Sequence, residues 1–138
     1  MRFVIVTGIS GAGKSTALKF LEDAQYFCVD NLPIPLLEKF ASMTLSMNSE
    51  EIRNVALGVD VRSGQQLGDL ESILEKMRHQ GYQFEILFLD ASDEVLIKRY
   101  KESRRNHPLA PDGRVDEGIQ LERKKLEFLR NQADYVIN

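Results

Sequence analysis

The chain has 138 residues, of which 43% are hydrophobic and 28% are charged. This length suits one domain with its own core, and the composition excludes a disordered or fibrous protein. The formal net charge of −3 argues against a general nucleic-acid coat, which needs an overall cationic field, although it leaves room for a local basic patch.

The first half of the chain predicts two strand–helix pairs. The run "RFVIVT" (2–7) is short, apolar and β-branched, and ends at Gly8, which predicts a buried strand. The stretch "KSTALKFLEDA" (14–24) has apolar residues at helical spacing and predicts a helix. The run "YFCV" (26–29) predicts a second strand, and residues 33 to about 43 predict a helix that tolerates proline in its first turn.

The second half of the chain continues this alternation. In chain order it predicts a strand at 54–61, a helix at 66–81, a strand at 84–89, helices at 93–104 and 115–133, and a strand that opens at 134–138. Apolar strands that alternate with helices predict an α/β fold, with a five-stranded parallel sheet covered on both faces. Because such a sheet normally continues from its fifth strand into a covering helix, we expect residues 1–138 to be one domain of a longer protein.

A glycine-rich motif joins the first predicted strand to the first predicted helix. "GISGAGKS" matches the Walker A pattern G-x-x-x-x-G-K-[ST] without departure. Glycines let backbone N–H groups approach a phosphate, and the helix N-terminus adds a partial positive charge. Lys14 is expected to reach the β- and γ-phosphates, and the Ser15 hydroxyl to ligate Mg²⁺. We therefore predict that ATP or GTP binds, with Mg²⁺, to Gly8, Ile9, Ser10, Gly11, Ala12, Gly13, Lys14, Ser15 and Thr16.

Two acids follow predicted strands and compete for the role of second Mg²⁺ ligand. Asp60 and Asp90 both belong at the carboxyl edge of the sheet, where ligands bind. Arg62 and Ser63 follow closely after Asp60 and are also predicted to face the nucleotide. The acids after Asp90 have an ordinary structural use at a helix start, so Asp60 is preferred and Asp90 is the second choice.

Residues 98–108, "KRYKESRRNHP", form a basic run with two interpretations of equal weight. The charges can complement a helix C-terminus and a solvated face. Alternatively, arginines close over the transferred phosphate, with Arg104 and Arg105 joining Lys14 and Asp60 as catalytic residues, or they grip a nucleic-acid backbone.

Earlier in the chain, Asp30 follows the second strand. Asp30 and the next residue, Asn31, are candidate second-substrate residues, although a turn or capping role is favoured for them.

Several stretches together resemble the bacterial RNase adapter family of RapZ-type nucleotide-binding proteins. They are "GISGAGKS", "LEDAQYFCVDNLP", "VDVRSG", "LFLDASDEVLIKRYKESRRNHPL" and "ADYVI". The resemblance implies a P-loop NTPase domain similar to nucleotide kinases, with weak ATPase and GTPase activity. It assigns the segment from Gly8 to Ser15 to ATP, and the segment from Asp60 to Ser63 to GTP. Some members of the family hand small regulatory RNAs to an endonuclease, mostly through a C-terminal domain.

Three functions follow from these observations. The first is a regulatory domain that hydrolyses ATP or GTP slowly, since no glutamine or glutamate is clearly placed to position water. The second is a small-molecule or nucleotide kinase, and the third is an RNA-binding module. Small RNA, a ribonuclease and a second copy of the chain are candidate partners through the full-length protein. The N-terminal apolar run is too short for a signal peptide or a membrane span, so we expect a cytoplasmic protein.

Overall fold

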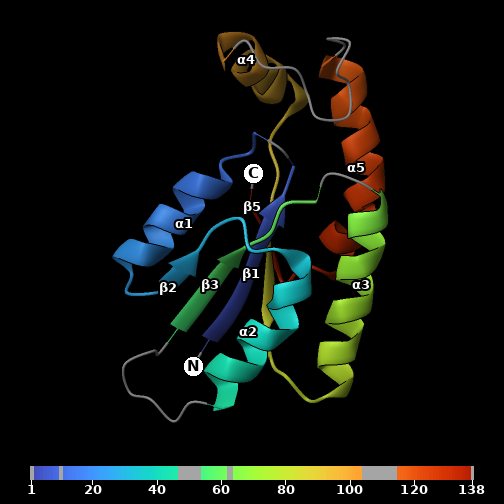
Figure 1. Cartoon of the computed structure of the whole chain (residues 1–138). Helices are drawn as coiled ribbons and strands as arrows, with labels where there is room; N and C mark the ends of the chain where they lie inside the picture. The colour runs from blue at the N-terminus through green and yellow to red at the C-terminus, as the bar shows by residue number, and fades with distance from the viewer. Residues whose placement is uncertain (1, 10, 47–53, 62–63, 104–114, 138) are drawn as a thin grey trace.

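The strands and helices alternate along the chain as the sequence predicts (Figure 1). The computed structural model describes residues 2–9, 11–46, 54–61, 64–103 and 115–137. In chain order the elements are β1 (Arg2–Gly8), α1 (Lys14–Asp23), β2 (Phe27–Val29), α2 (Ile34–Ser46), β3 (Asn54–Gly58), α3 (Gly64–His79), β4 (Glu85–Leu89), α4 (Asp93–Ser103), α5 (Val115–Gln132) and β5 (Tyr135–Ile137).

All five strands are parallel and lie in the order β2-β3-β1-β4-β5. The three central strands are almost wholly buried, whereas the edge strands β2 and β5 are partly or fully exposed. This order confirms the five-stranded parallel sheet and places the end of β1 between the ends of β3 and β4. In sheets of this kind the ligand site lies at the carboxyl edge, where the strand order reverses.

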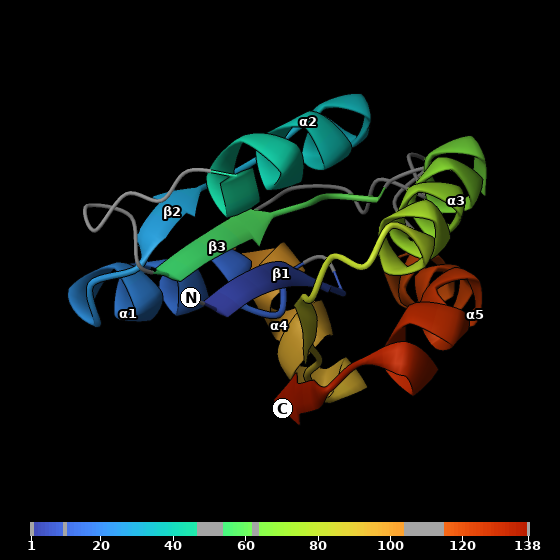
Figure 2. The same ribbon diagram turned by 90° about the horizontal axis from the view of Figure 1, so that it is seen from below.

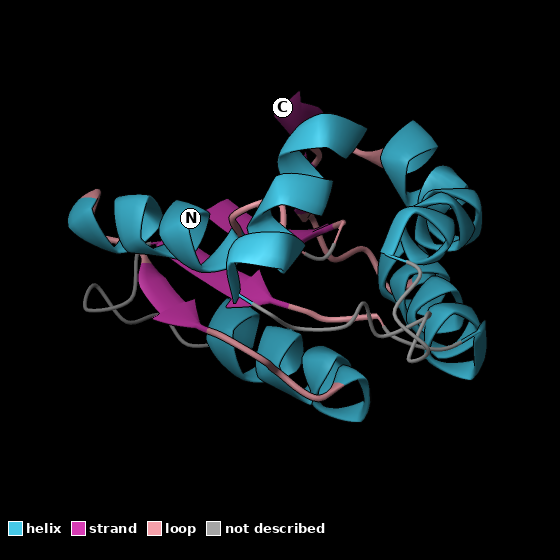
Figure 3. Ribbon diagram, turned by 90° about the horizontal axis from the view of Figure 1, so that it is seen from above, coloured by secondary structure: helices cyan, strands magenta, loops and turns pink. Residues whose placement is uncertain are grey.

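Two sets of side chains alternate along the central strands and face opposite sides of the sheet. On one side, Val4 and Val6 pack with Leu18 of α1. On the other side, Ile5 and Phe88 belong to a larger core that also includes apolar residues of α2, α3 and α5. Viewed from either end, the strands lie between these helices (Figures 2 and 3). Burial of both faces explains why the strands read as continuous apolar runs.

The third strand ends earlier than its apolar pattern predicts. The ladder between β1 and β3 ends where Val6 is opposite Gly58, whereas β1 stays paired with β4 as far as Gly8. Val59 still donates to the Val6 carbonyl over 2.9 Å, and Asp60 lies just beyond the last paired residue. The early end of β3 therefore brings Asp60 to the edge where the loop begins.

Helix α4 lies beyond the carboxyl ends of the strands, above the start of α1 (Figure 1). Its inner side is anchored by Leu96, which is fully buried in the larger core. Among the described helices, none has both the length and the apolar character needed to cross a membrane.

Candidate nucleotide-binding site

The loop after β1 turns tightly against the end of β4. Ile9 donates its backbone N–H to the Leu89 carbonyl over 3.0 Å, and Ala12 donates to the Ile9 carbonyl over 3.0 Å. A Cβ added to Gly8 would lie 2.2 Å from the Leu89 carbonyl oxygen, so only glycine fits there. Gly11 and Gly13 have φ angles of 86° and 96°, a left-handed conformation that side chains disfavour. The backbone of the loop thus favours glycine at all three positions.

The loop ends at the N-terminus of α1, which has neither a side-chain cap nor an acid in its first turn. Gly13 occupies the capping position and has no side chain to offer to the first amides of the helix. Ser15 and Thr16 lie in the first turn and are exposed. An uncapped N-terminus presents several amide donors and a partial positive charge in one place, which suits an anion.

Lys14 forms an ion pair with Asp60, and this contact joins the loop to the end of β3. The Asp60 side chain is 36% exposed, whereas that of Lys14 is 16% exposed and its Nζ is buried, so solvent reaches the pair from the Asp60 side. Ser15, which follows Lys14 in α1, carries a hydroxyl. A carboxylate and a hydroxyl beside an anion-binding loop are the oxygen ligands that Mg²⁺ uses in nucleotide sites. The residues present therefore fit a magnesium–nucleotide complex.

Asp90 lies on the other side of the loop and is enclosed by two arginines of α5. Its Oδ1 accepts from Arg123 Nη1 over 2.6 Å and from the Ala91 backbone N–H over 2.7 Å. Its Oδ2 accepts from Arg130 Nε over 3.3 Å. The Asp90 side chain is only 9% exposed. Asp90 thus anchors α5 to the end of β4 and is less accessible than Asp60.

Arg123 also pairs with Asp93 at the start of α4, with 2.9 Å between its Nε and Oδ1. Burial alone would lower the pKa of Arg123, but hydrogen bonds to Asp90 and Asp93 raise it above its ordinary value. The guanidinium therefore stays charged and links β4, α4 and α5. Nothing in the sequence distinguished Arg123 and Arg130 from the other charged residues of a long amphipathic helix.

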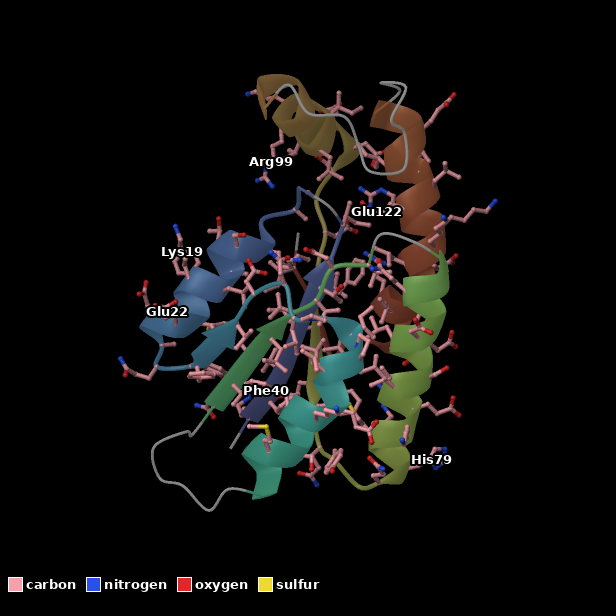
Figure 4. All side chains as sticks on the ribbon, in the orientation of Figure 1. Lys19, Glu22, Phe40, His79, Arg99 and Glu122 are labelled. Carbon is pink, nitrogen blue, oxygen red and sulfur yellow. The ribbon has the colours of Figure 1, made fainter. Side chains whose placement is uncertain are left out.

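Arg99 of α4 reaches the loop directly. Its Nη1 donates to the Gly11 carbonyl, and the side chain points from α4 toward the start of α1 (Figure 4). The sequence singled out the basic run 98–108 that contains this residue, but it emphasised Arg104 and Arg105. A charge count within the run could not identify Arg99, because the position of α4 over the sheet edge decides which arginine meets the loop.

The remaining predicted site residues divide into two groups. Val61 is partly buried against the larger core, where its side chain packs with apolar neighbours. The predictions for Ser10, Arg62, Ser63, Arg104 and Arg105 lie outside the described residues.

The turn after β2 contacts the end of β3. Asp30 Oδ1 accepts from the Asn31 backbone N–H over 2.8 Å, and Asn31 has a left-handed φ of 52°. Leu32 then donates its N–H to the Gly58 carbonyl over 2.9 Å. These contacts agree with the turn-forming role that the sequence favours for Asp30.

A cavity of about 520 Å³ adjoins the loop on the α5 side. Ile9 belongs both to the loop and to the cavity wall, and Asp90 lines the same cavity. Three basic residues, Arg123, Lys124 and Arg130, contribute to its lining. The volume lies in the range typical of small-molecule sites.

Comparison with known families shows which family the chain matches. The family described as "RapZ-like N-terminal domain" matches residues 1–138. This chain belongs to that family. A nucleotide-binding protein of Lachnoclostridium phytofermentans is 62% identical over 138 residues, which are 100% of this chain and 48% of that protein. A nucleotide-binding protein of Agathobacter rectalis is 55% identical and is covered to 47%. The chain of this RapZ-like domain therefore spans about half the length of these curated relatives.

Solved structures of P-loop kinases share the fold of this RapZ-like domain. Shikimate kinase from Acinetobacter baumannii, in complex with shikimate, aligns with a TM-score of 0.66 and 15% identity, over 100% of this chain and 83% of the kinase chain. Shikimate kinase from Bacteroides thetaiotaomicron aligns with a TM-score of 0.62 and 20% identity, over 99% and 85% of the two chains. The predicted nucleotide-kinase-like P-loop fold is thereby confirmed.

Proposed function

We propose that this RapZ-like domain binds ATP or GTP as a magnesium complex at the loop of residues 8–16 and hydrolyses it slowly. One observation carries the proposal. A loop of left-handed glycines leads into an uncapped helix, and its lysine pairs with an acid at the end of the neighbouring strand. The name "Nucleotide-binding protein" of the relatives agrees with it.

Each residue of the site has a distinct role in this proposal. The loop amides hold the phosphates, and Lys14 moves from Asp60 to the β- and γ-phosphates when nucleotide enters. Ser15 and the Asp60 carboxylate would hold Mg²⁺, which would neutralise phosphate charge. We expect hydrolysis to be slow, because the sequence places no glutamine or glutamate clearly where it could position water. Gln120, which is near the adjoining cavity, already donates its amide to Asp93 over 2.6 Å.

The test is the affinity of the Lys14→Ala variant for Mg²⁺-bound ATP and GTP, measured by calorimetry. Lys14 supplies a charged donor to the phosphates, so we expect affinity to fall at least ~10-fold with little change in thermal unfolding. Lys19→Ala is the matched control, because Lys19 is an exposed lysine further along the same helix (Figure 4). Equal affinities of Lys14→Ala and wild type would refute the site.

A small-molecule or nucleotide kinase is the second candidate function, and the cavity beside Ile9 favours it. Its three basic residues outnumber the acids Asp90 and Glu127 in the lining, which suits an anionic acceptor, and Ile9 places the cavity next to the phosphate loop. Incubation of labelled ATP with a panel of phosphate- and carboxylate-bearing metabolites separates the two candidates. One phosphorylated acceptor per ATP consumed favours a kinase, whereas label released only as inorganic phosphate favours hydrolysis.

Roles in RNA decay are proposed only for a longer protein that contains this domain. The chain spans about half of its curated relatives, so we propose that residues 1–138 are a nucleotide-binding domain that reports ligand state to the rest of a cytoplasmic protein. Binding of small RNA, of a ribonuclease or of a second copy would then involve that longer protein. RNA binding by the chain of residues 1–138 alone, with steep salt dependence, would instead favour the RNA-binding function.

A further inference from the structure

Arg99 occupies a position over the end of the phosphate loop. Its Nη1 donates to the Gly11 carbonyl, and the same atom lies 3.9 Å from where a Cβ on Gly13 would be. Gly13 is the N-cap residue directly before the first residue of α1. The guanidinium therefore lies beside the amides that the uncapped helix presents, on the side of the loop that faces α4 (Figure 4).

The charge of Arg99 is unfavourable in this position unless an anion is present. The N-terminus of a helix carries about half a positive charge, and a second cation beside it is repelled. The first turn of α1 contains no acid that could offset this repulsion, and the nearby Asp60 carboxylate is paired with Lys14. The Gly11 carbonyl is a neutral acceptor and compensates only in part. A phosphate group between these positive groups would be attracted by all of them.

A guanidinium can serve the loop and a ligand at the same time. Arg99 has five N–H donors in a planar fork, and the Gly11 carbonyl engages its Nη1. The other N–H groups of the guanidinium can form paired hydrogen bonds to phosphate oxygens, which a lysine ammonium cannot reproduce. Arg99 can therefore keep its contact with Gly11 while it binds a nucleotide, and no rearrangement of α4 is needed.

We propose that Arg99 is a phosphate-binding residue of this site, which donates to the polyphosphate of a nucleotide in the loop and thereby ties α4 to the bound ligand. This inference rests on the proposed function and deepens it. It also gives α4 a role as the element that responds to occupancy of the loop, since Leu96 in the same helix is buried in the core. The link from ligand to core would run through one helix.

The experiment compares Arg99→Gln and Arg99→Lys with Lys98→Gln, which removes a neighbouring exposed charge from the same helix. Affinities for Mg²⁺-bound ATP and for inorganic triphosphate are measured by calorimetry and competition, and thermal unfolding is recorded with and without ATP. We expect Arg99→Gln to weaken both ligands about 10-fold or more, Arg99→Lys to weaken them less, and Lys98→Gln to change them less than about twofold.

The unfolding curves distinguish ligand binding from a structural role. Because Arg99 is repelled by the helix end, Arg99→Gln should leave the midpoint of the ligand-free protein unchanged or higher, and should reduce only the shift caused by ATP. A lower ligand-free midpoint with normal ATP affinity would overturn the inference. Loss of ATP affinity with unchanged triphosphate affinity would also overturn it, because Arg99 would then act on the nucleoside.

Failure of the inference and failure of the proposed function have different signatures. If wild type binds ATP, Lys14→Ala does not, and Arg99→Gln binds normally, the role of Arg99 alone is overturned. If wild type binds neither ATP nor GTP, the proposed function fails and the role of Arg99 fails with it.

Discussion

At the scale of single residues, the structure separates two acids that occupy similar places in the sequence. Asp60 and Asp90 each follow a central strand, one on either side of the phosphate loop. Asp60 pairs with Lys14 of the loop, and its side chain is 36% exposed. Asp90 is 9% exposed and is held by Arg123 and Arg130. In the proposed function Asp60 exchanges its partner for Mg²⁺, whereas Asp90 remains bound to the arginines of α5.

The two asparagine variants should therefore have different effects: Asp60→Asn should mainly lower the rate of hydrolysis, and Asp90→Asn should mainly lower the stability of the fold. We expect Asp60→Asn to reduce Mg²⁺-dependent ATP hydrolysis about 10-fold or more, which corresponds to ~1.4 kcal/mol of transition-state stabilisation, with a small effect on unfolding. Asp90→Asn should destabilise the fold by about 2 kcal/mol, since two arginines lose a carboxylate partner that is largely buried. Hydrolysis rates and urea unfolding curves of both variants check this, and the reverse ranking in the hydrolysis assay would reassign the Mg²⁺ acid.

At the scale of elements, β2, β3 and α1 meet closely at one glycine. A Cβ added to Gly58 would lie 2.7 Å from Asp30 Oδ1 and 2.9 Å from Leu18 Cδ1. Both distances are well below normal contact, so the turn after β2 and the inner face of α1 depend on the missing side chain. Gly58 is therefore a packing requirement, and it allows the end of β3 to lie beside the loop.

The substitution Gly58→Ala should destabilise the chain, whereas Gly68→Ala should stabilise it. We expect a loss of about 1–2 kcal/mol at Gly58, because Asp30 and Leu18 must shift to admit a methyl group. Gly68 lies within α3, is exposed and has no atom within 4 Å of an added Cβ, so alanine should gain about 0.5–1 kcal/mol through helix propensity. Urea unfolding of the two variants measures both effects. A stabilised Gly58→Ala variant would contradict the packing argument.

At the scale of the whole molecule, strand order gathers the site from distant parts of the chain. The order β2-β3-β1-β4-β5 puts the loop after β1 between Asp60 and Asp90, and α4 brings Arg99 to the same edge. Residues that are far apart in sequence thus surround one glycine-rich turn. A ligand that contacts several of these elements should stabilise the folded state as a whole.

Binding of nucleotide should therefore raise thermal stability in a magnesium-dependent manner. At a ligand concentration 100 times the dissociation constant, a site present only in the folded state adds about 2.7 kcal/mol to the free energy of unfolding. We expect a clear upward shift of the unfolding midpoint with ATP and Mg²⁺, and a smaller shift after Mg²⁺ is chelated with EDTA. Shifts of equal size in the two conditions would contradict the role of Ser15 and Asp60 in holding Mg²⁺.

The sequence by itself determined the elements and the phosphate loop, because both depend on local rules. Apolar periodicity predicted every strand and helix with errors of a few residues at the ends, and the glycine–lysine motif needed only its own backbone conformation. The sequence also favoured Asp60 through the residues around Asp90. Only the tertiary structure decided that Arg123 and Arg130 enclose Asp90, and that Arg99 is an arginine that meets the loop. Those contacts depend on strand order and on where α4 and α5 pack, which are long-range properties that no local pattern records.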